Sequence, residues 1–194
     1  MLAAAILAAG ESRRMGTPKA LLPYQGQTFV EHWVEAVHHP RIGVTRIVLG
    51  AGAEEIQAKL RVNPGFIVVN RDWDHGQLSS MQAAIRSLPL GETEGIIFCP
   101  VDHPLVSAHL VAQLIEKFDS SGMPIVVPTF NGCRGHPVIF RATLYDELLA
   151  ASPEVGARQV VWAHARDMIE VPTSEEGVIV NLNDPEGLRK ALGR

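Results

Sequence analysis

The stretch LAAGESRRMGTPK, residues 7–19, closes an apolar run that begins near the amino terminus. Residues 2–9 are only alanine, leucine and isoleucine, and the run stops at Gly10. Such a run is typical of a buried strand, and a glycine directly after a strand lets the backbone approach a ligand closely. We therefore expect a first strand over residues 3–7 with a ligand-binding loop immediately after it.

The charges in this loop favour an anionic ligand. Arg13, Arg14 and Lys19 oppose Glu11 alone, so three positive charges and one negative give a local +2 in a chain of formal net charge −4. Backbone N–H groups in such a turn can point at phosphate oxygens, and side-chain cations add hydrogen bonds of about 1.5–3 kcal/mol each. The loop predicts a polyphosphate site; the alternative is a solvated basic loop.

Spacing argues against three other interpretations. An export signal carries its positive charge before the apolar run, whereas here both arginines follow it. A P-loop has four residues between its glycines and then Lys and Ser or Thr, whereas five residues separate Gly10 from Gly16. The GAG at residues 50–52 lacks the third glycine of a dinucleotide fingerprint, because position 55 is Glu55.

Composition points to one globular domain over residues 1–194. Hydrophobic residues make up 46% of the chain, and the mean hydropathy is +0.10, as expected for a sheet buried on both faces. The net negative charge argues against nucleic-acid binding, and no apolar run is long enough to cross a bilayer. Two distant cysteines, Cys99 and Cys133, favour a reducing, cytoplasmic compartment and no zinc site.

Strand-like and helical stretches alternate along the chain, which predicts a mostly parallel sheet with helices on both faces, a three-layer Rossmann-like α/β fold. Strands are expected at residues 3–7, 46–49, 66–69, 95–98, 125–127, 138–140, 168–171 and 178–180. Helices are expected at residues 28–38, 53–60, 79–88, 107–118, 141–150, 157–165 and 185–192. Residues 122–140 break the alternation and predict a small hairpin or insertion at the sheet edge.

Ligands of such sheets bind at the carboxyl ends of the strands, and polar residues gather in those loops. Asp102 follows a buried strand between Pro100 and Pro104, where a carboxylate suits Mg²⁺ bound with substrate phosphates; the alternative is a turn or helix cap. Asn183 follows the last expected strand and either reaches Asp102 or caps the final helix.

Two further loops leave their roles open on residues alone. In HGQLSS, Gln77 and Ser80 either contact a nucleotide or start a helix, and the nearby Trp73 is expected to pack rather than stack on a base. In RGHPVIF, Arg134 and His136 either bind an anionic second substrate or belong to an ordinary hairpin turn.

Together these segments resemble the MobA-like nucleotidyltransferases, which make molybdenum-cofactor dinucleotides. LAAGESRRMGTPK is similar to the family signature LAAGxSxRMGxxK, and HGQLSSM, PVDHPLV, RGHPVIF, GARQVV and NLNDPEGL follow in the family's order. The resemblance covers nearly the whole chain. LAAG, RGHPVIF and GAR resemble the cytidylyltransferase branch, whereas Asp184 stands where the family has threonine.

The resemblance implies that CMP is transferred from CTP to molybdopterin, with Mg²⁺ as cofactor and pyrophosphate as leaving group. Arg14, Lys19 and Asp102 would be catalytic, Asp102 and Asn183 would bind the metal, and Arg134 and His136 would lie near the pterin. The implied nucleotide-binding residues are Leu7, Ala8, Ala9, Gly10, Ser12, Arg13, Asn70, Gln77, Ser80 and Pro100.

A molybdoenzyme is an implied protein partner, and the oligomeric state stays open. Transfer to a sugar or polyol phosphate is an alternative, as is a non-catalytic nucleotide-binding chaperone. An oxidoreductase has the least support.

Overall fold

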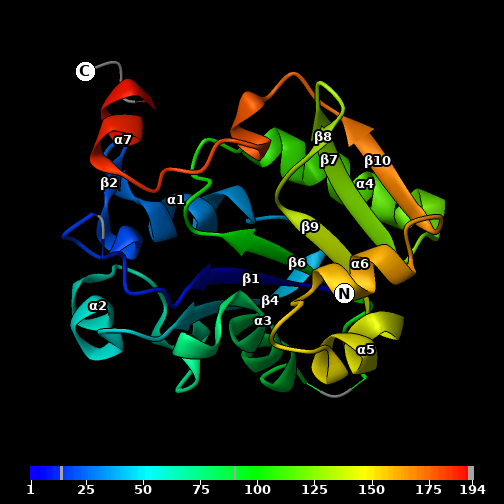
Figure 1. Ribbon diagram of the computed structural model, residues 1–194, viewed down its shortest axis with the longest axis horizontal. Coiled ribbons are helices and arrows are strands. Elements are labelled where there is room, and N and C mark those ends of the chain that lie inside the picture. Colours follow the sequence, from blue (N-terminus) through cyan, green and yellow to red (C-terminus); the bar gives the residue numbers. More distant parts are fainter. Residues whose placement is uncertain (14, 90, 192–194) are drawn as a thin grey trace.

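The computed structural model describes residues 1–13, 15–89 and 91–191. Its main sheet has eight strands within those residues, in the order β10-β7-β9-β6-β1-β4-β5, with β8 paired to β7 (Figure 1). These strands are β1 (Leu2–Ala8), β4 (Ile42–Leu49), β5 (Ile67–Val69), β6 (Gly95–Pro100), β7 (Ile125–Phe130), β8 (Cys133–Arg134), β9 (Val138–Arg141) and β10 (Met168–Pro172). A separate ribbon joins β2 (Pro23–Tyr24) and β3 (Gln27–Thr28).

Helices cover both faces of this sheet (Figure 1). They are α1 (Phe29–Ala36), α2 (Ala53–Lys59), α3 (Gln77–Arg86), α4 (Ala108–Ser121), α5 (Tyr145–Ala150), α6 (Arg158–Ala163) and α7 (Pro185–Ala191). The predicted three-layer α/β architecture is confirmed. In the described part of the chain, no helix is both long and apolar enough to cross a membrane.

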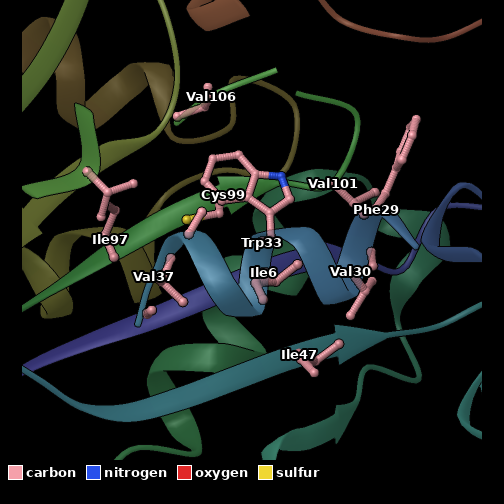
Figure 2. Close-up of a cluster of buried hydrophobic side chains, with 14 of the residues drawn as sticks. Ile6, Phe29, Val30, Trp33, Val37, Ile47, Ile97, Cys99, Val101 and Val106 are labelled. Atoms are coloured by element: carbon pink, nitrogen blue, oxygen red, sulfur yellow. The ribbon is translucent and has the colours of Figure 1, made fainter. Parts of the chain in front are cut away.

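Strand β1 contributes side chains to the hydrophobic cores on both faces of the sheet, and each of its residues is buried. Successive side chains point to opposite faces, so Ile6 packs with α1 and α4 while Leu7 packs with α3 and α5. Figure 2 shows the first of these cores, with the fully buried Trp33 of α1 lying over β1 and β6. The sheet is therefore packed on both faces at the point where the chain leaves β1.

The hairpin expected near residues 122–140 is present, but it lies inside the sheet. Strand β9 runs antiparallel to both β6 and β7, and β10 then adds to the outer side of β7 in parallel. Local sequence pattern could not reveal this position, since it depends on which distant strand covers the free edge.

One predicted strand is wrong. Residues 178–180 form no strand; a short 3₁₀ helix over Glu176–Val178 stands there instead. The backbone N–H of Val180 bonds to the carbonyl of Glu176 at 3.2 Å, so local turns take the hydrogen bonds that a sheet would have used. This compact segment carries the chain back across the carboxyl end of the sheet.

Candidate functional site

A cavity of about 330 Å³ opens where β1 and β6 end, as expected for a parallel sheet. It collects residues from three separate segments of the chain. Its lining comprises Leu7, Ala8, Ala9, Gly10, Ser12, Lys19, Trp73, Gly76, Gln77, Ser80, Pro100, Val101 and Asp102. Most of the residues expected at the nucleotide site therefore face one space.

The loop after β1 is held in a compact turn by Ser12. Ser12 adopts a left-handed conformation with φ of 56°, and its carbonyl accepts a hydrogen bond from the N–H of Met15 at 2.9 Å. Its hydroxyl accepts another from the backbone N–H of Lys19, also at 2.9 Å. The turn thereby fixes the start of the Lys19 side chain at the mouth of the cavity.

Lys19 joins two residues that lie far away in the sequence. Its Nζ donates to Asp102 Oδ2 at 3.2 Å and also to Asn183 Oδ1. The side chains of Lys19 and Asp102 are only 18% and 23% exposed, so solvent screens their attraction less than on an open surface. One ammonium, one carboxylate and one amide oxygen thus form a small polar cluster beside the cavity.

Asn183 reaches this cluster because the segment of residues 175–183 is fastened to neighbouring loops. The N–H of Leu182 donates to the carbonyl of Asp102 at 2.7 Å, and the N–H of His136 donates to the carbonyl of Val178 at 2.8 Å. Gly135 permits the second crossing, since a Cβ at that position would lie 2.2 Å from the Val178 carbonyl oxygen. These backbone contacts, together with the buried side chains of Val178 and Leu182, place Asn183.

The wall formed by the start of α3 is organised by Asn70. Its buried amide donates to the hydroxyls of Ser79 and Ser80 at 2.8 and 3.1 Å. Asn70 itself does not line the cavity. It orients the two serines through these hydrogen bonds, and Ser80 lines the cavity. Trp73 packs against Gly50, where a Cβ would lie 2.4 Å from the Trp73 Cβ, and it also lines the cavity.

A second cavity of about 350 Å³ adjoins the first and shares Leu7, Gly76, Gln77 and Pro100 with it. Its wall is largely apolar and is formed by Leu78, Met81, Phe98, Val138, Phe140 and Val161. The histidines His75 and His136 also line it, as do Arg158 and Glu154, so it holds one cation and one carboxylate. The arrangement suits an organic molecule with an apolar body and a peripheral anionic group.

His136 is kept neutral in this setting. Its ring lies 5.0 Å from that of His103, and its Nδ1 is buried without a hydrogen-bond partner among the described residues. Burial, reinforced by the nearby His103, lowers the pKa of His136 to about 4. Burial likewise lowers the pKa of His103, whose Nδ1 lies 3.3 Å from the carbonyl oxygen of Gly177.

This pKa predicts an acid-sensitive fold. The pKa of His136 is about 4 in the folded protein, whereas an unfolded histidine has a pKa of about 6.5. Between these pH values the unfolded chain therefore binds more protons than the folded one. The free energy of unfolding should therefore fall as the pH drops through this window. His136 should contribute about 2 kcal/mol of the loss between about pH 7 and about pH 4.5.

Urea unfolding of the wild type and of His136→Gln at both pH values measures this contribution. The variant should lose less stability on acidification than the wild type, although His103 and other groups still titrate. Equal losses in the two proteins would assign the acid sensitivity elsewhere.

Three arginines were expected at the site, and the two that the structure describes line neither cavity. Arg13 is 82% exposed and pairs with Glu11 at 2.6 Å, so its charge is already compensated. Arg134 lies in β8 and pairs with Glu170 of β10 at 2.7 Å, and it lines neither of these two cavities. Arg14 falls outside the described residues.

The donor set of the cluster fits a hard divalent cation only in part. The carboxylate of Asp102 and the amide oxygen of Asn183 are oxygen ligands of the kind Mg²⁺ prefers, and the Lys19 ammonium stands between them as a cation. The described ranges contain no group of three or more His, Cys, Asp or Glu side chains that could hold a metal ion, here or elsewhere. A metal held here would take its remaining ligands from substrate phosphates and water.

Sequence reasoning missed two features of this region. Trp73 was expected only to pack, yet it also faces the first cavity. Arg158 belongs to the GAR segment, but only the structure shows that it lines the same cavity as His136 and residues of α3 and β9. The available signal was the glycine at position 156, which the structure places just before α6 with a φ of 73°.

Comparison with protein families and known proteins gives consistent matches. A family model described as the MobA-like NTP transferase domain matches residues 4–168. A molybdenum cofactor guanylyltransferase from Shewanella sp. (strain ANA-3) is 27% identical over 188 residues, covering 94% of this chain and 91% of its own. A nicotine blue oxidoreductase from Paenarthrobacter nicotinovorans is 34% identical over 165 residues, covering 79% of this chain and 78% of its own.

Solved structures share the fold. The crystal structure of Rv0371C from Mycobacterium tuberculosis in complex with manganese superimposes with a TM-score of 0.73 at 21% identity, covering 100% of this chain and 98% of that one. At this level of identity the likeness is evidence for the fold alone.

Proposed function

The chain belongs to the MobA-like NTP transferase family, and from this premise we propose that it transfers CMP from CTP to a molybdopterin-type phosphate acceptor. Pyrophosphate is the leaving group, and Mg²⁺ is the cofactor. The observation that carries this proposal is the Lys19–Asp102–Asn183 cluster beside the turn that follows β1. Phosphoryl-type transfer needs positioning and charge neutralisation more than a nucleophilic side chain, and this cluster offers both.

The nucleotide would occupy the first cavity. The turn of residues 8–10 would bring backbone close to its phosphates, and Lys19 would supply an ammonium. Arg14, which lies outside the described residues, is proposed as a second cation. Gln77 and Ser80 face the same space and offer polar groups to the ribose or the base. Ser12 and Asn70 act as positioning residues, because their hydrogen bonds go to the backbone of Lys19 and to Ser79 and Ser80.

The metal would be held by Asp102 and Asn183. When bound, Mg²⁺ neutralises the charge that develops on the phosphates of the nucleotide. Asp102 would hold it with a full negative charge and Asn183 with a neutral dipole, so the protein would contribute few ligands and leave positions for the substrate. The Rv0371C complex with manganese is a further reason to test Mn²⁺ beside Mg²⁺.

The acceptor would occupy the second cavity. Its apolar wall suits a fused-ring body, and Arg158 at its edge suits an anionic substituent. The residues shared by the two cavities would bring the attacking phosphate oxygen near the α-phosphate of the nucleotide. His136 stays neutral there and offers a hydrogen-bonding imidazole without repelling a cation at Asp102.

Arg158→Gln tests this assignment. The KM for the acceptor should rise by about tenfold or more, because a charge-assisted hydrogen bond worth about 1.5–3 kcal/mol is lost, while the KM for the nucleotide stays near the wild-type value. Steady-state pyrophosphate release measures the two constants when acceptor and nucleotide concentrations are varied in turn. Arg166→Gln, an exposed change beyond the end of α6, serves as the matched control. Equal KM values for Arg158→Gln and the control would place the acceptor elsewhere.

Ala9 bears on which nucleobase the first cavity accepts. Ala9 is buried at the wall of the first cavity, and its Cβ narrows the space where glycine would leave more room. This favours the smaller pyrimidine, whereas the curated relative from Shewanella is named as a guanylyltransferase. Thermal shift with each nucleoside triphosphate and Mg²⁺ ranks the four bases, since a ligand that binds only the folded state raises Tm.

Pyrophosphate release tests the activity itself. The protein is incubated with Mg²⁺, each triphosphate and either molybdopterin or a panel of sugar and polyol phosphates. Release with CTP and molybdopterin is expected. Release only with a sugar or polyol phosphate would replace the acceptor, and triphosphate binding without any release would indicate a non-catalytic nucleotide-binding chaperone.

An oxidoreductase is the second candidate, favoured by the name of the relative from Paenarthrobacter. The GAG at residues 50–52 gives it little physical support. Gly50 serves the close packing of Trp73, and α2 after Gly52 is a helix of 7 residues. Oxidation of NADH or NADPH in the presence of a heteroaromatic acceptor, read at the nicotinamide absorbance, would favour this candidate over transfer.

We further propose that the chain forms one catalytic domain and passes its product to a protein partner. We treat residues 1–194 as one catalytic domain, because eight of the described strands, including the first and the last, belong to a single main sheet. A molybdoenzyme would receive the product. Co-purification of the product-loaded protein with such an enzyme measures that step.

A further inference from the structure

The Lys19 ammonium contacts both oxygen ligands of the proposed metal site. Its Nζ lies 3.2 Å from Asp102 Oδ2 and bonds to Asn183 Oδ1, and all three side chains are partly buried. Asn183 presents its oxygen, not its NH₂ group, to the ammonium. The pair of oxygens therefore already coordinates a cation, which is the protein's own.

A divalent cation and the ammonium compete for these oxygens. Each oxygen that turns to a metal loses its bond to Nζ, and two cations between the same ligands repel one another in a site that solvent screens weakly. Asp102 supplies the cluster's one negative charge, so it cannot neutralise both cations. A metal that takes the two oxygens bound to Nζ, Asp102 Oδ2 and Asn183 Oδ1, therefore displaces the Lys19 side chain.

The first cavity offers the Lys19 ammonium an alternative position. Lys19 lines this cavity together with the backbone of Ala8–Gly10, where the proposed function puts the nucleotide phosphates. A triphosphate carries several negative charges and compensates the ammonium better than one shared carboxylate. Arg13 is already paired with Glu11, which leaves Lys19 as the described cation of this loop that faces the cavity.

We propose that Lys19 closes the divalent-cation site and that nucleotide phosphates open it by drawing the ammonium away from Asp102 and Asn183. The proposal rests on the proposed function for the identity of the nucleotide, and it adds an order of binding. Metal binds the protein weakly before the triphosphate and tightly with it. By reciprocal linkage, the metal strengthens triphosphate binding by the same factor.

Mn²⁺ binding without nucleotide tests this closure directly. The free Mn²⁺ signal is followed by electron paramagnetic resonance while metal is added to the wild type, Lys19→Met and Lys19→Arg. Lys19→Met removes the charge from a side chain of similar length and should bind Mn²⁺ at least tenfold more tightly than the wild type. Lys19→Arg keeps the charge and should bind as weakly as the wild type.

Two controls locate the effect. Lys59→Met removes an exposed lysine that pairs with Glu55 at 2.6 Å on α2, and it should bind Mn²⁺ as the wild type does. Adding Asp102→Asn to Lys19→Met should abolish the gained affinity. If Lys19→Met does not give a folded protein, as judged by circular dichroism and thermal melting, Lys19→Gln replaces it in the same comparison.

The outcomes separate this inference from the proposed function. Equal Mn²⁺ affinity in Lys19→Met and the wild type overturns the closure, as does a gain that survives Asp102→Asn. Pyrophosphate release by the wild type is measured separately. Release together with no gain in Lys19→Met leaves the function standing without the closure, and a gain without release from any triphosphate leaves the closure standing without the function.

Discussion

Replacing Asp102 with asparagine should reduce nucleotidyl transfer by about 100- to 1000-fold, the usual loss when one preorganised electrostatic group is removed from a transition state. The substitution keeps the shape of the side chain and removes its negative charge. A cation beside Asn183 then loses its one charged protein ligand, while the neighbouring phosphates still bring their own negative charge. Pyrophosphate release under single-turnover conditions measures the loss in the transfer step.

The fold should survive this substitution. The Lys19–Asp102 pair is partly exposed, so its loss should cost about 1 kcal/mol or less, and an asparagine oxygen can still accept from Nζ. Asp146→Asn on α5 provides a matched exposed control and should keep wild-type turnover. If Asp102→Asn retains more than about a tenth of the wild-type rate, Asp102 does not have the assigned role.

Replacing Gly135 with alanine should produce the largest loss of stability. The added Cβ would lie 2.2 Å from the carbonyl oxygen of Val178 and 2.6 Å from its carbonyl carbon. Backbone atoms cannot rotate away as a side-chain tip can, so the two segments must separate. Overpacking of this kind costs about 3 kcal/mol, which lowers Tm by about 6 to 12 °C in a chain of this size.

The separation should also reduce activity. The bond from the N–H of His136 to the Val178 carbonyl, 2.8 Å long, spans this contact, and Asn183 follows a few residues later. Turnover measured well below the lowered Tm should therefore fall together with Mn²⁺ affinity. Gly187→Ala, whose Cβ would lie an ordinary 3.4 Å from Asp184 Oδ1, should leave Tm unchanged or raise it slightly. Equal Tm values for the two variants would show that the crossing at Gly135 has room to adjust.

The glycine at position 135 illustrates what a sequence pattern can and cannot convey. RGHPVIF predicted a turn before a strand, and β9 does begin at Val138. Nothing in the local residues indicated that residue 178 would pass within contact distance of this turn. A glycine required by a close approach looks the same in the sequence as one required by a positive φ.

The same distinction holds for the cations. The sequence predicted a phosphate-binding loop from its net charge, yet the structure pairs Arg13 with Glu11 and Lys19 with Asp102. Arg134 was expected near the second substrate, and an ion pair with Glu170 holds it instead at the β8–β10 side of the sheet. Charge counts give the number of cations in a segment, but partners from other segments decide which of them face a ligand.

The sequence by itself determined the α/β architecture, the turn after β1 and most of the residues that line the first cavity. These features depend on short-range patterns: an apolar strand, a glycine turn, and polar residues at successive strand ends. Only the tertiary structure decided that Asp102, 83 positions from Lys19, and Asn183, 164 positions from it, share its ammonium. It also decided that α6 brings Arg158 to a second cavity. The physical reason is that such contacts are set by how the sheet is covered and crossed, and no local pattern of residues encodes that.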